Sequence, residues 1–252
     1  VTTLMAIGTN LVLLPLHRPV DIAEQVALID QACGGRFILT VGQGYRPEEF
    51  AMFGIDPANR GAEMEERLAV LQAALAGETV TWRGRTATVR PGPYTEGGMR
   101  LSYGGGTPAA ARRAARFGLD FIGEADRPDL AEVYAAEAER VGRAPGACLV
   151  PSKASPSSVF VAEDVDAAWE AMGPHLLHDA QAYGAWLGDD HDAVTKSRAA
   201  SVDELRAEGG SYRIVTPEEA VALVHAHGYL GLQPLCGGLD PEPAWSSLRL
   251  IE

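Results

Sequence analysis

A glycine-rich turn followed by a helix signal is the part of the sequence best suited to bind a ligand. Gly104, Gly105 and Gly106 allow the backbone to approach a ligand closely, while Thr107 and Pro108 are typical of the cap and first position of a helix. The free N–H groups and the positive dipole end of such a helix would face the turn. The pattern predicts a phosphate or anion site at Gly105, Gly106 and Thr107, with an ordinary strand-to-helix turn as the alternative.

Two other segments carry side chains suited to chemistry directly after strand candidates. Gln43 and Tyr45 follow the buried run at 37–41, and an amide with an aromatic ring suits hydrogen bonding to, and stacking on, a ring system. His17 and Arg18 follow the first strand candidate, where an acid or a cation could face a pocket. The alternative is that His17 caps a turn and Arg18 extends into solvent.

The histidine and aspartate clusters do not predict a metal site. His175 and His178 share a helix face but lack a third ligand at metal spacing. The run from Asp189 to Asp192 has hard-metal ligands, but it is more typical of a solvated loop, because such sites need preorganised oxygens.

Strand and helix signals alternate along the chain and predict an α/β fold with a parallel sheet. A capping box with proline at the first helical position, Thr216-Pro-Glu-Glu219, marks one helix start. An open doubly wound sheet and a barrel both satisfy the pattern, and in both the ligands bind at the carboxyl ends of the strands. The strand candidates are 4–9, 37–41, 99–103, 119–122, 158–161, 212–215 and 229–235, and the helix candidates are 19–33, 59–76, 108–117, 128–141, 164–187, 202–207, the helix from 216 and 241–250.

One segment departs from the alternation of strands and helices. Residues 79–82 and 86–89 alternate as β segments around Arg83-Gly84-Arg85, which predicts a β-hairpin excursion at about 79–90. No linker or repeat divides the chain, so a single domain over 1–252 is expected. We expect the buried strand residues to include Leu4, Ile7, Phe37, Leu39, Val41, Leu101, Phe121 and Leu232.

Composition excludes several classes of partner. The formal net charge of −13 and the pI near 4.9 argue against nucleic acid or an anionic membrane, because both would repel the chain. Cys33, Cys148 and Cys236 are odd in number and far apart, so we interpret them as small buried hydrophobes in a reducing compartment. With no bilayer-length apolar run and no signal-peptide pattern, a cytoplasmic location is expected.

Several segments together resemble the bacterial luciferase-like monooxygenase family in order and spacing. They include Ile7-Gly-Thr-Asn-Leu-Val-Leu-Leu-Pro-Leu-His-Arg-Pro-Val20, Val41-Gly-Gln-Gly-Tyr-Arg-Pro-Glu-Glu-Phe50, 105–118 and 237–250. The resemblance implies a TIM (β/α)8-type barrel, complete or incomplete. It also implies that reduced FMN, or alternatively a deazaflavin coenzyme, binds at the carboxyl mouth.

The resemblance also implies roles for particular residues. Asn10 and Leu11 match the place of a non-proline cis peptide beside the flavin ring, and Gln43 and Tyr45 match ring or phosphate contacts. The turn at 105–107 matches the phosphate loop. Gln43 departs from the arginine that members often carry there. The two βα units that usually precede the segment beginning at Ile7, one with the usual catalytic histidine, are not among these residues, so no catalytic residue is predicted.

Three functions follow from this resemblance. The first is a flavin-dependent monooxygenase that acts on a small organic substrate with reduced FMN and oxygen, with a flavin reductase as partner and a homodimer formed through the helix at 20–33. The second is a deazaflavin-dependent oxidoreductase, and the third is a non-catalytic flavin-binding protein with a reduced barrel. A flavin-free aldolase-like or isomerase-like barrel is the weakest alternative, because no lysine ends a predicted strand. Substrate contacts are expected from variable loops such as 188–210.

Overall fold

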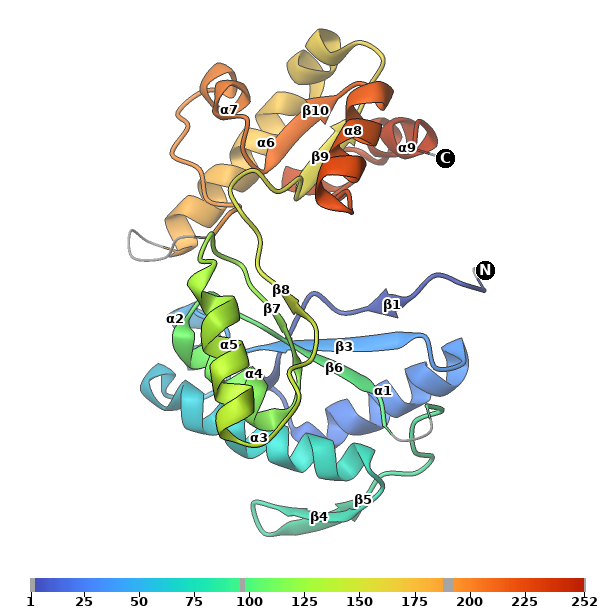
Figure 1. Ribbon diagram of the computed structural model, residues 1–252, viewed down its shortest axis with the longest axis vertical. Coiled ribbons are helices and arrows are strands. Elements are labelled where there is room, and N and C mark those ends of the chain that lie inside the picture. The colour runs from blue at the N-terminus through green and yellow to red at the C-terminus, as the bar shows by residue number, and fades with distance from the viewer. Residues whose placement is uncertain (1–2, 96–97, 188–192, 252) are drawn as a thin grey trace. The chain divides into compact units, whose positions relative to one another are not determined.

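The computed structural model describes residues 3–95, 98–187 and 193–251 of the chain (Figure 1). Its contacts divide the chain into two compact units. The first comprises 1–123 and 129–150, and the second comprises 124–128 and 151–252. A single barrel domain over 1–252 stays a prediction.

Unit 1 is built on a parallel sheet. Its strand order is β1-β3-β6-β7-β8, and β2 also pairs with β3. The predicted strands near 37–41, 99–103 and 119–122 are confirmed, whereas β8 was too short to be recognised. The strands are β1 (Ile7–Gly8), β2 (Val12–Leu13), β3 (Phe37–Gly42), β6 (Arg100–Gly104), β7 (Asp120–Ile122) and β8 (Cys148–Leu149).

Helices of unit 1 pack against this sheet and against one another, with α1 on α3 and α4 on α5. Left-handed glycines end two of them, Gly34 after α1 and Gly118 after α4. The sequence analysis missed α2, whose signals are Pro47 at the first position and acidic residues in the first turn. The helices are α1 (Pro19–Cys33), α2 (Pro47–Met52), α3 (Arg60–Leu75), α4 (Pro108–Phe117) and α5 (Asp129–Arg140), with short 3-10 helices η1 (Leu14–Leu16) and η2 (Pro57–Asn59).

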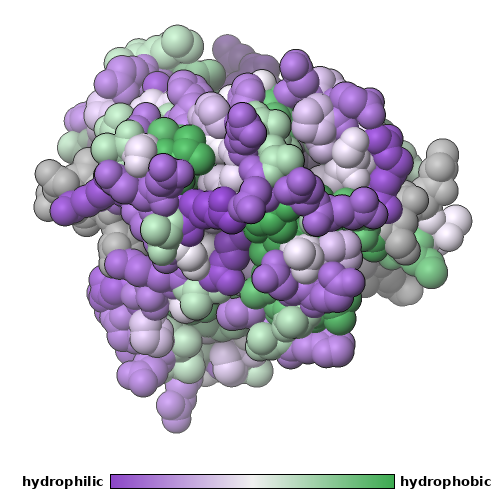
Figure 2. Space-filling view, turned by 90° about the horizontal axis from the view of Figure 1, so that it is seen from above, coloured by the Kyte–Doolittle hydropathy of each residue, from purple (hydrophilic) through white to green (hydrophobic). Residues whose placement is uncertain are grey.

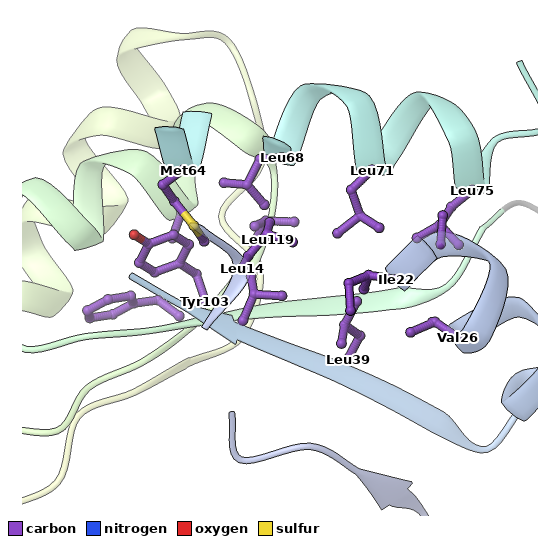
Figure 3. Close-up of a cluster of buried hydrophobic side chains, with 14 of the residues drawn as sticks. Leu14, Ile22, Val26, Leu39, Met64, Leu68, Leu71, Leu75, Tyr103 and Leu119 are labelled. Atoms are coloured by element: carbon purple, nitrogen blue, oxygen red, sulfur yellow. The ribbon is translucent and has the colours of Figure 1, made fainter. Parts of the chain in front are cut away.

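The core of unit 1 lies between the sheet and the helices α1 and α3 (Figure 3). Leu39 of β3 and Leu68 and Leu71 of α3 are fully buried there. Burying a leucine side chain contributes about 1.5–3 kcal/mol, so this contact fixes α3 on the sheet. The loops that follow β3 and β6 are thereby held at one edge.

The predicted hairpin at 79–90 is confirmed. Strands β4 (Thr79–Trp82) and β5 (Arg85–Thr88) pair antiparallel around Arg83 and Gly84, which both have positive φ, as two-residue hairpin turns require. The Trp82 ring lies beneath the guanidinium groups of Arg67 and Arg83. These contacts attach the hairpin to α3.

Unit 2 contains a parallel pair of strands with helices around it. The capping box predicted at Thr216 is confirmed, since its side chain and that of Glu219 bond reciprocally to the backbone. The predicted helices at 164–187, 202–207 and 241–250 are also confirmed. The elements are β9 (Ser158–Val161), α6 (Val165–Leu187), α7 (Val202–Glu208), β10 (Tyr212–Val215), α8 (Pro217–His227), η3 (Cys236–Gly238) and α9 (Pro241–Arg249).

Some burial predictions at the sheet edge are wrong. Phe37, Leu39, Val41 and Phe121 are buried and Leu101 is partly buried, but Leu4, Ile7 and Leu232 are 94%, 46% and 38% exposed. Leu4 precedes β1, and Ile7 lies on β1, which pairs only with β3 among the described strands. Leu232 lies in unit 2 outside any described strand.

The predicted last strand at 229–235 is absent from the described residues. There Gly231 exchanges two backbone hydrogen bonds with the segment 156–159, and the chain then turns into η3, so no ladder continues past it.

The prediction that all three cysteines are buried is wrong for two of them. Cys236 is buried, but Cys33 is partly buried and Cys148 is exposed, because β8 lies at the edge of its sheet.

One face of the surface is mostly polar. Hydrophilic side chains cover most of the face seen in Figure 2, with hydrophobic side chains in smaller patches. Among the described residues, no helix has both the length and the apolar character needed to cross a membrane.

Candidate active site

An irregularity in the edge strand of unit 1 creates the first part of the site. Gly8 pairs with Ile38 and Val12 pairs with Val41. Between these two pairs the edge strand has three residues, 9–11, whereas β3 has two, 39–40. The segment Thr9–Leu11 therefore holds one extra residue, a β-bulge, a feature that re-aims side chains beside active sites. The peptide between Asn10 and Leu11 is cis, which confirms the expectation drawn from the resemblance.

The Thr9 side chain makes two hydrogen bonds to the β3 backbone beside the bulge. Its hydroxyl donates to the Thr40 carbonyl over 2.9 Å and accepts from the Thr40 N–H over 3.0 Å. Because Thr40 is buried, loss of the Thr9 hydroxyl would take a hydrogen-bond partner from both of its backbone groups. Thr9 thus holds the bulge in register with β3.

The bulge directs Leu11 across the carboxyl ends of β3 and β6. Gly42 and Gly104 end these strands and are register partners. A Cβ on Gly42 would lie 2.5 Å from Leu11 Cδ1, and one on Gly104 would lie 2.4 Å from Leu11 Cδ2. Glycine at both strand ends is what leaves room for the Leu11 side chain.

The turn after β6 lies beside this leucine. The Gly105 N–H donates to the Ile122 carbonyl of β7 over 3.1 Å, and the Thr107 hydroxyl caps α4 by accepting from Ala110 N over 3.2 Å. Within the described residues, no hydrogen bond uses the N–H groups of Gly106 and Thr107. These amides, and not that of Gly105, are therefore free for a ligand.

A buried arginine that was not predicted from the sequence contacts Gln43 and Tyr103. Arg113 of α4 donates to Glu65 Oε1 (3.0 Å), to Gln43 Oε1 (3.2 Å) and to the Tyr103 hydroxyl (3.1 Å). Arg116 also donates to Glu65, over 2.6 Å, so two guanidinium groups share one carboxylate. Burial raises the pKa of Tyr103, although Arg113 acts in the opposite direction. The only sequence signal was an arginine on the alanine-rich, buried face of a helix.

A cavity of about 610 Å³ opens on the other side of Leu11. Its walls come from the loop after the bulge and from α2 with the residues that flank it. Most of the lining side chains are apolar. The lining residues are Leu11, Val12, Leu13, Leu16, His17, Arg46, Glu48, Glu49, Met52 and Phe53.

His17 lines this cavity with its ring 6.3 Å from that of Phe53, centroid to centroid. Burial, and secondarily the charge of Arg67, lower the pKa of His17, which favours the neutral form of the imidazole. Arg18, by contrast, pairs with Asp21 on the exposed surface, in agreement with the solvent alternative.

The remaining predicted residues take no part in the hydrogen bonds described above. Asn10 and Tyr45 are exposed beside the bulge and after β3. His175 Nδ1 lies 3.1 Å from the Gly237 carbonyl, and no group of three metal-ligating side chains occurs among the described residues, whereas Asp189 to Asp192 lie outside them. The structure therefore brings Leu11, Gln43 and the turn at 105–107 to one sheet edge.

Comparison with known proteins decides the family. The family model described as luciferase-like monooxygenase matches residues 1–233. The chain belongs to this family. Over 80 residues it is 39% identical to limonene 1,2-monooxygenase of Rhodococcus erythropolis (32% of this chain and 21% of that protein), and over 77 residues 38% identical to 4-hydroxyprotoasukamycin monooxygenase of Streptomyces nodosus subsp. asukaensis (31% and 21%). The matches thus span about a fifth of these curated relatives.

Solved structures of luciferase-like proteins share the fold. Monooxygenase RslO1 from Streptomyces bottropensis has a TM-score of 0.75 at 22% identity, over 97% of this chain and 75% of its own. The oxygenating constituent of 3,6-diketocamphane monooxygenase from Pseudomonas putida, in complex with FMN, has a TM-score of 0.66 at 18% identity (98% and 77%). An F420-dependent secondary alcohol dehydrogenase has a TM-score of 0.64 at 16% identity (98% and 79%). The fold is therefore that of the luciferase-like TIM-barrel type.

Proposed function

We propose that the chain is a flavin-dependent oxidoreductase of the monooxygenase type that uses reduced FMN and oxygen on a small organic substrate. The phosphate of FMN binds at the N-terminus of α4, on the free amides of Gly106 and Thr107. The flavin ring lies beside Leu11, at the carboxyl ends of β3 and β6, within reach of Gln43 and Tyr45.

The free amides at the start of α4 are the observation that carries this proposal. The first turn of α4 contains no acidic side chain, so nothing repels an anion there. Arg113 of the same helix reaches Gln43 at the sheet edge, while its charge is paired with Glu65, which also pairs with Arg116 in the last turn of α4. Each charge-assisted hydrogen bond to a phosphate contributes about 1.5–3 kcal/mol.

The neighbouring residues suit a planar, largely apolar ring. Leu11 offers an apolar surface, and Gln43 offers an amide whose oxygen is held by Arg113. Reduced flavin, when bound, supplies the two electrons needed to activate dioxygen. The protein's part is to orient the ring and, through the apolar side chains around Leu11, to exclude water.

A deazaflavin coenzyme is the second candidate, supported by the fold shared with an F420-dependent dehydrogenase. Both cofactors carry a phosphate that suits α4, so anion binding alone does not separate them. Oxygen consumption with reduced FMN supports the monooxygenase, and substrate oxidation with F420 in the absence of oxygen supports the alternative. FMN binding without turnover supports the non-catalytic flavin-binding protein.

Two partners belong to the same proposal. A flavin reductase would supply reduced FMN. A second copy of the chain would pack on α1, whose Leu28 and Ile29 side chains are 50% and 42% exposed.

The test is an FMN titration followed by flavin fluorescence. In the double variant Gly106→Val, Thr107→Ala the branched side chain enters the phosphate site and the cap is lost, so FMN affinity should fall at least about 100-fold, the loss of two such bonds. The matched control is Gly92→Val, Thr216→Ala, which alters a partly buried glycine whose added Cβ would meet nothing within 4 Å and removes the cap of α8.

The control should bind FMN like the parent. Equal affinity of the double variant and the parent would refute the phosphate site. No measurable affinity in the parent would refute FMN as the cofactor.

A further inference from the structure

The cavity beside Leu11 has a polar pattern that the proposed cofactor does not explain. Its polar side chains are Arg46, Glu48, Glu49 and His17. Arg46 and Glu49 pair with each other over 3.2 Å, so their charges are compensated. Glu48 is exposed in the first turn of α2, where the helix dipole favours a carboxylate in water.

His17 differs from these three groups. Its backbone is fixed, because its N–H donates to the Leu14 carbonyl over 3.1 Å and its carbonyl accepts from Arg67 over 2.9 Å. Its imidazole has ring contact with Phe53 but no hydrogen bond within the part of the chain that the structure describes. The cavity is therefore lined by an exposed imidazole whose backbone is held in place and whose ring makes no hydrogen bond to a described residue.

We propose that this cavity binds the organic substrate and that His17 hydrogen-bonds to the one oxygen atom of a neutral, mainly apolar molecule. The volume of about 610 Å³ suits a small molecule, and the walls of Leu13, Leu16, Met52 and Phe53 suit a hydrocarbon body. Because Arg46 and Glu49 compensate each other, the lining favours neither an anion nor a cation.

The inference rests on the proposed function through Leu11. This side chain contacts the strand ends where the flavin ring is placed and also lines the cavity, so a molecule beside His17 lies next to the ring across one leucine. The His17 nitrogens are a binding group in this account: the ring donates an N–H to a carbonyl oxygen or accepts from a hydroxyl.

Substrate-like probes test the inference without flavin. Cyclohexanone, cyclohexanol and cyclohexane are titrated into the full chain while the histidine ring signals are followed by NMR. The ketone and the alcohol should shift the His17 signals and bind about fivefold more tightly than the hydrocarbon, the worth of one net hydrogen bond. The ring of His225, exposed on α8, is the internal reference.

Two variants separate the hydrogen bond from the packing. His17→Phe keeps a ring against Phe53 and should lose the fivefold preference while still binding cyclohexane. His17→Gln keeps a donor and an acceptor and should restore part of the preference. The control His225→Phe should leave all three affinities unchanged.

The outcomes are distinct from those of the FMN test. If FMN binds but the ketone and the alcohol shift His17 no more than His225, or bind His17→Phe as tightly as the parent, this inference is wrong and the proposed function stands. If the probes bind at His17 and FMN does not bind, the cavity stands and the flavin proposal is wrong.

Discussion

Thr9 is the residue that decides the shape of the site. Its hydroxyl makes two hydrogen bonds to the backbone of the buried Thr40 and so fixes the bulge that aims Leu11. A valine has the same shape without either bond. These hydrogen bonds could not be predicted from the sequence, because the sequence does not show which residue a strand threonine will contact.

We predict that Thr9→Val lowers the free energy of unfolding by about 1–3 kcal/mol, since it removes the Thr9 hydroxyl from both backbone groups of the buried Thr40. Thr9→Ser keeps the hydroxyl and should cost less. Chemical denaturation measures the difference, and hydrogen exchange of the Thr40 amide locates it. Equal stability and equal exchange in the two variants would show that the hydroxyl does not hold the bulge.

His17 should make stability depend on pH in a defined direction. Its folded pKa lies below 6.5, its ordinary value, so between the two values the unfolded chain binds more protons than the folded one. The free energy of unfolding therefore falls as the pH drops through that window, and the effect is small because the residue is partly exposed.

The comparison of His17→Phe with the parent isolates this effect. The variant should gain stability relative to the parent as the pH drops below about 6.5, and should show a constant difference above it. His225→Phe is the control. A difference between His17→Phe and the parent that stays constant over the whole range would contradict the lowered pKa.

At the scale of elements, regular helices were the most predictable feature. The helix expected at 19–33 is α1 residue for residue, and the capping box at Thr216 begins α8 as expected, since caps and periodicity are local signals. The exposed Leu4 and Leu232 were missed because burial at an edge depends on neighbours, which no local pattern encodes. Arg113 was missed for the same reason: Glu65 and Gln43 are distant in sequence.

Segment η3 depends on a close approach to α6. A Cβ on Gly237 would lie 1.9 Å from the His175 carbonyl oxygen, whereas a Cβ on Gly238 would meet nothing within 4 Å, and both glycines have positive φ. The two positions therefore share the backbone penalty and differ in the clash.

We predict that Gly238→Ala costs about 1–2 kcal/mol, the left-handed penalty alone. Gly237→Ala should cost at least about 3 kcal/mol, because a backbone carbonyl cannot move away as a side-chain end can. Thermal or chemical unfolding, with hydrogen exchange in α6 as the local probe, checks both. Similar costs for the two variants would show that η3 does not pack tightly on α6.

For the whole molecule, the family membership and the parallel α/β fold agree with the predictions from the sequence, and the proposed sites for cofactor and substrate go beyond them. Both proposed sites lie in unit 1, at the carboxyl ends of β2, β3 and β6. The net charge of the chain is negative and disfavours phosphate. The anion site proposed at α4 is therefore a local exception.

Hydrogen exchange of the full chain, with and without saturating FMN, tests this claim most directly. We predict the strongest slowing at the amides of 104–111, which include the free N–H groups of Gly106 and Thr107, with weaker slowing at 41–46. Amides of α8 and β10 serve as the reference. Unchanged exchange at 104–111 under saturating FMN, or the strongest slowing in another segment, would contradict it.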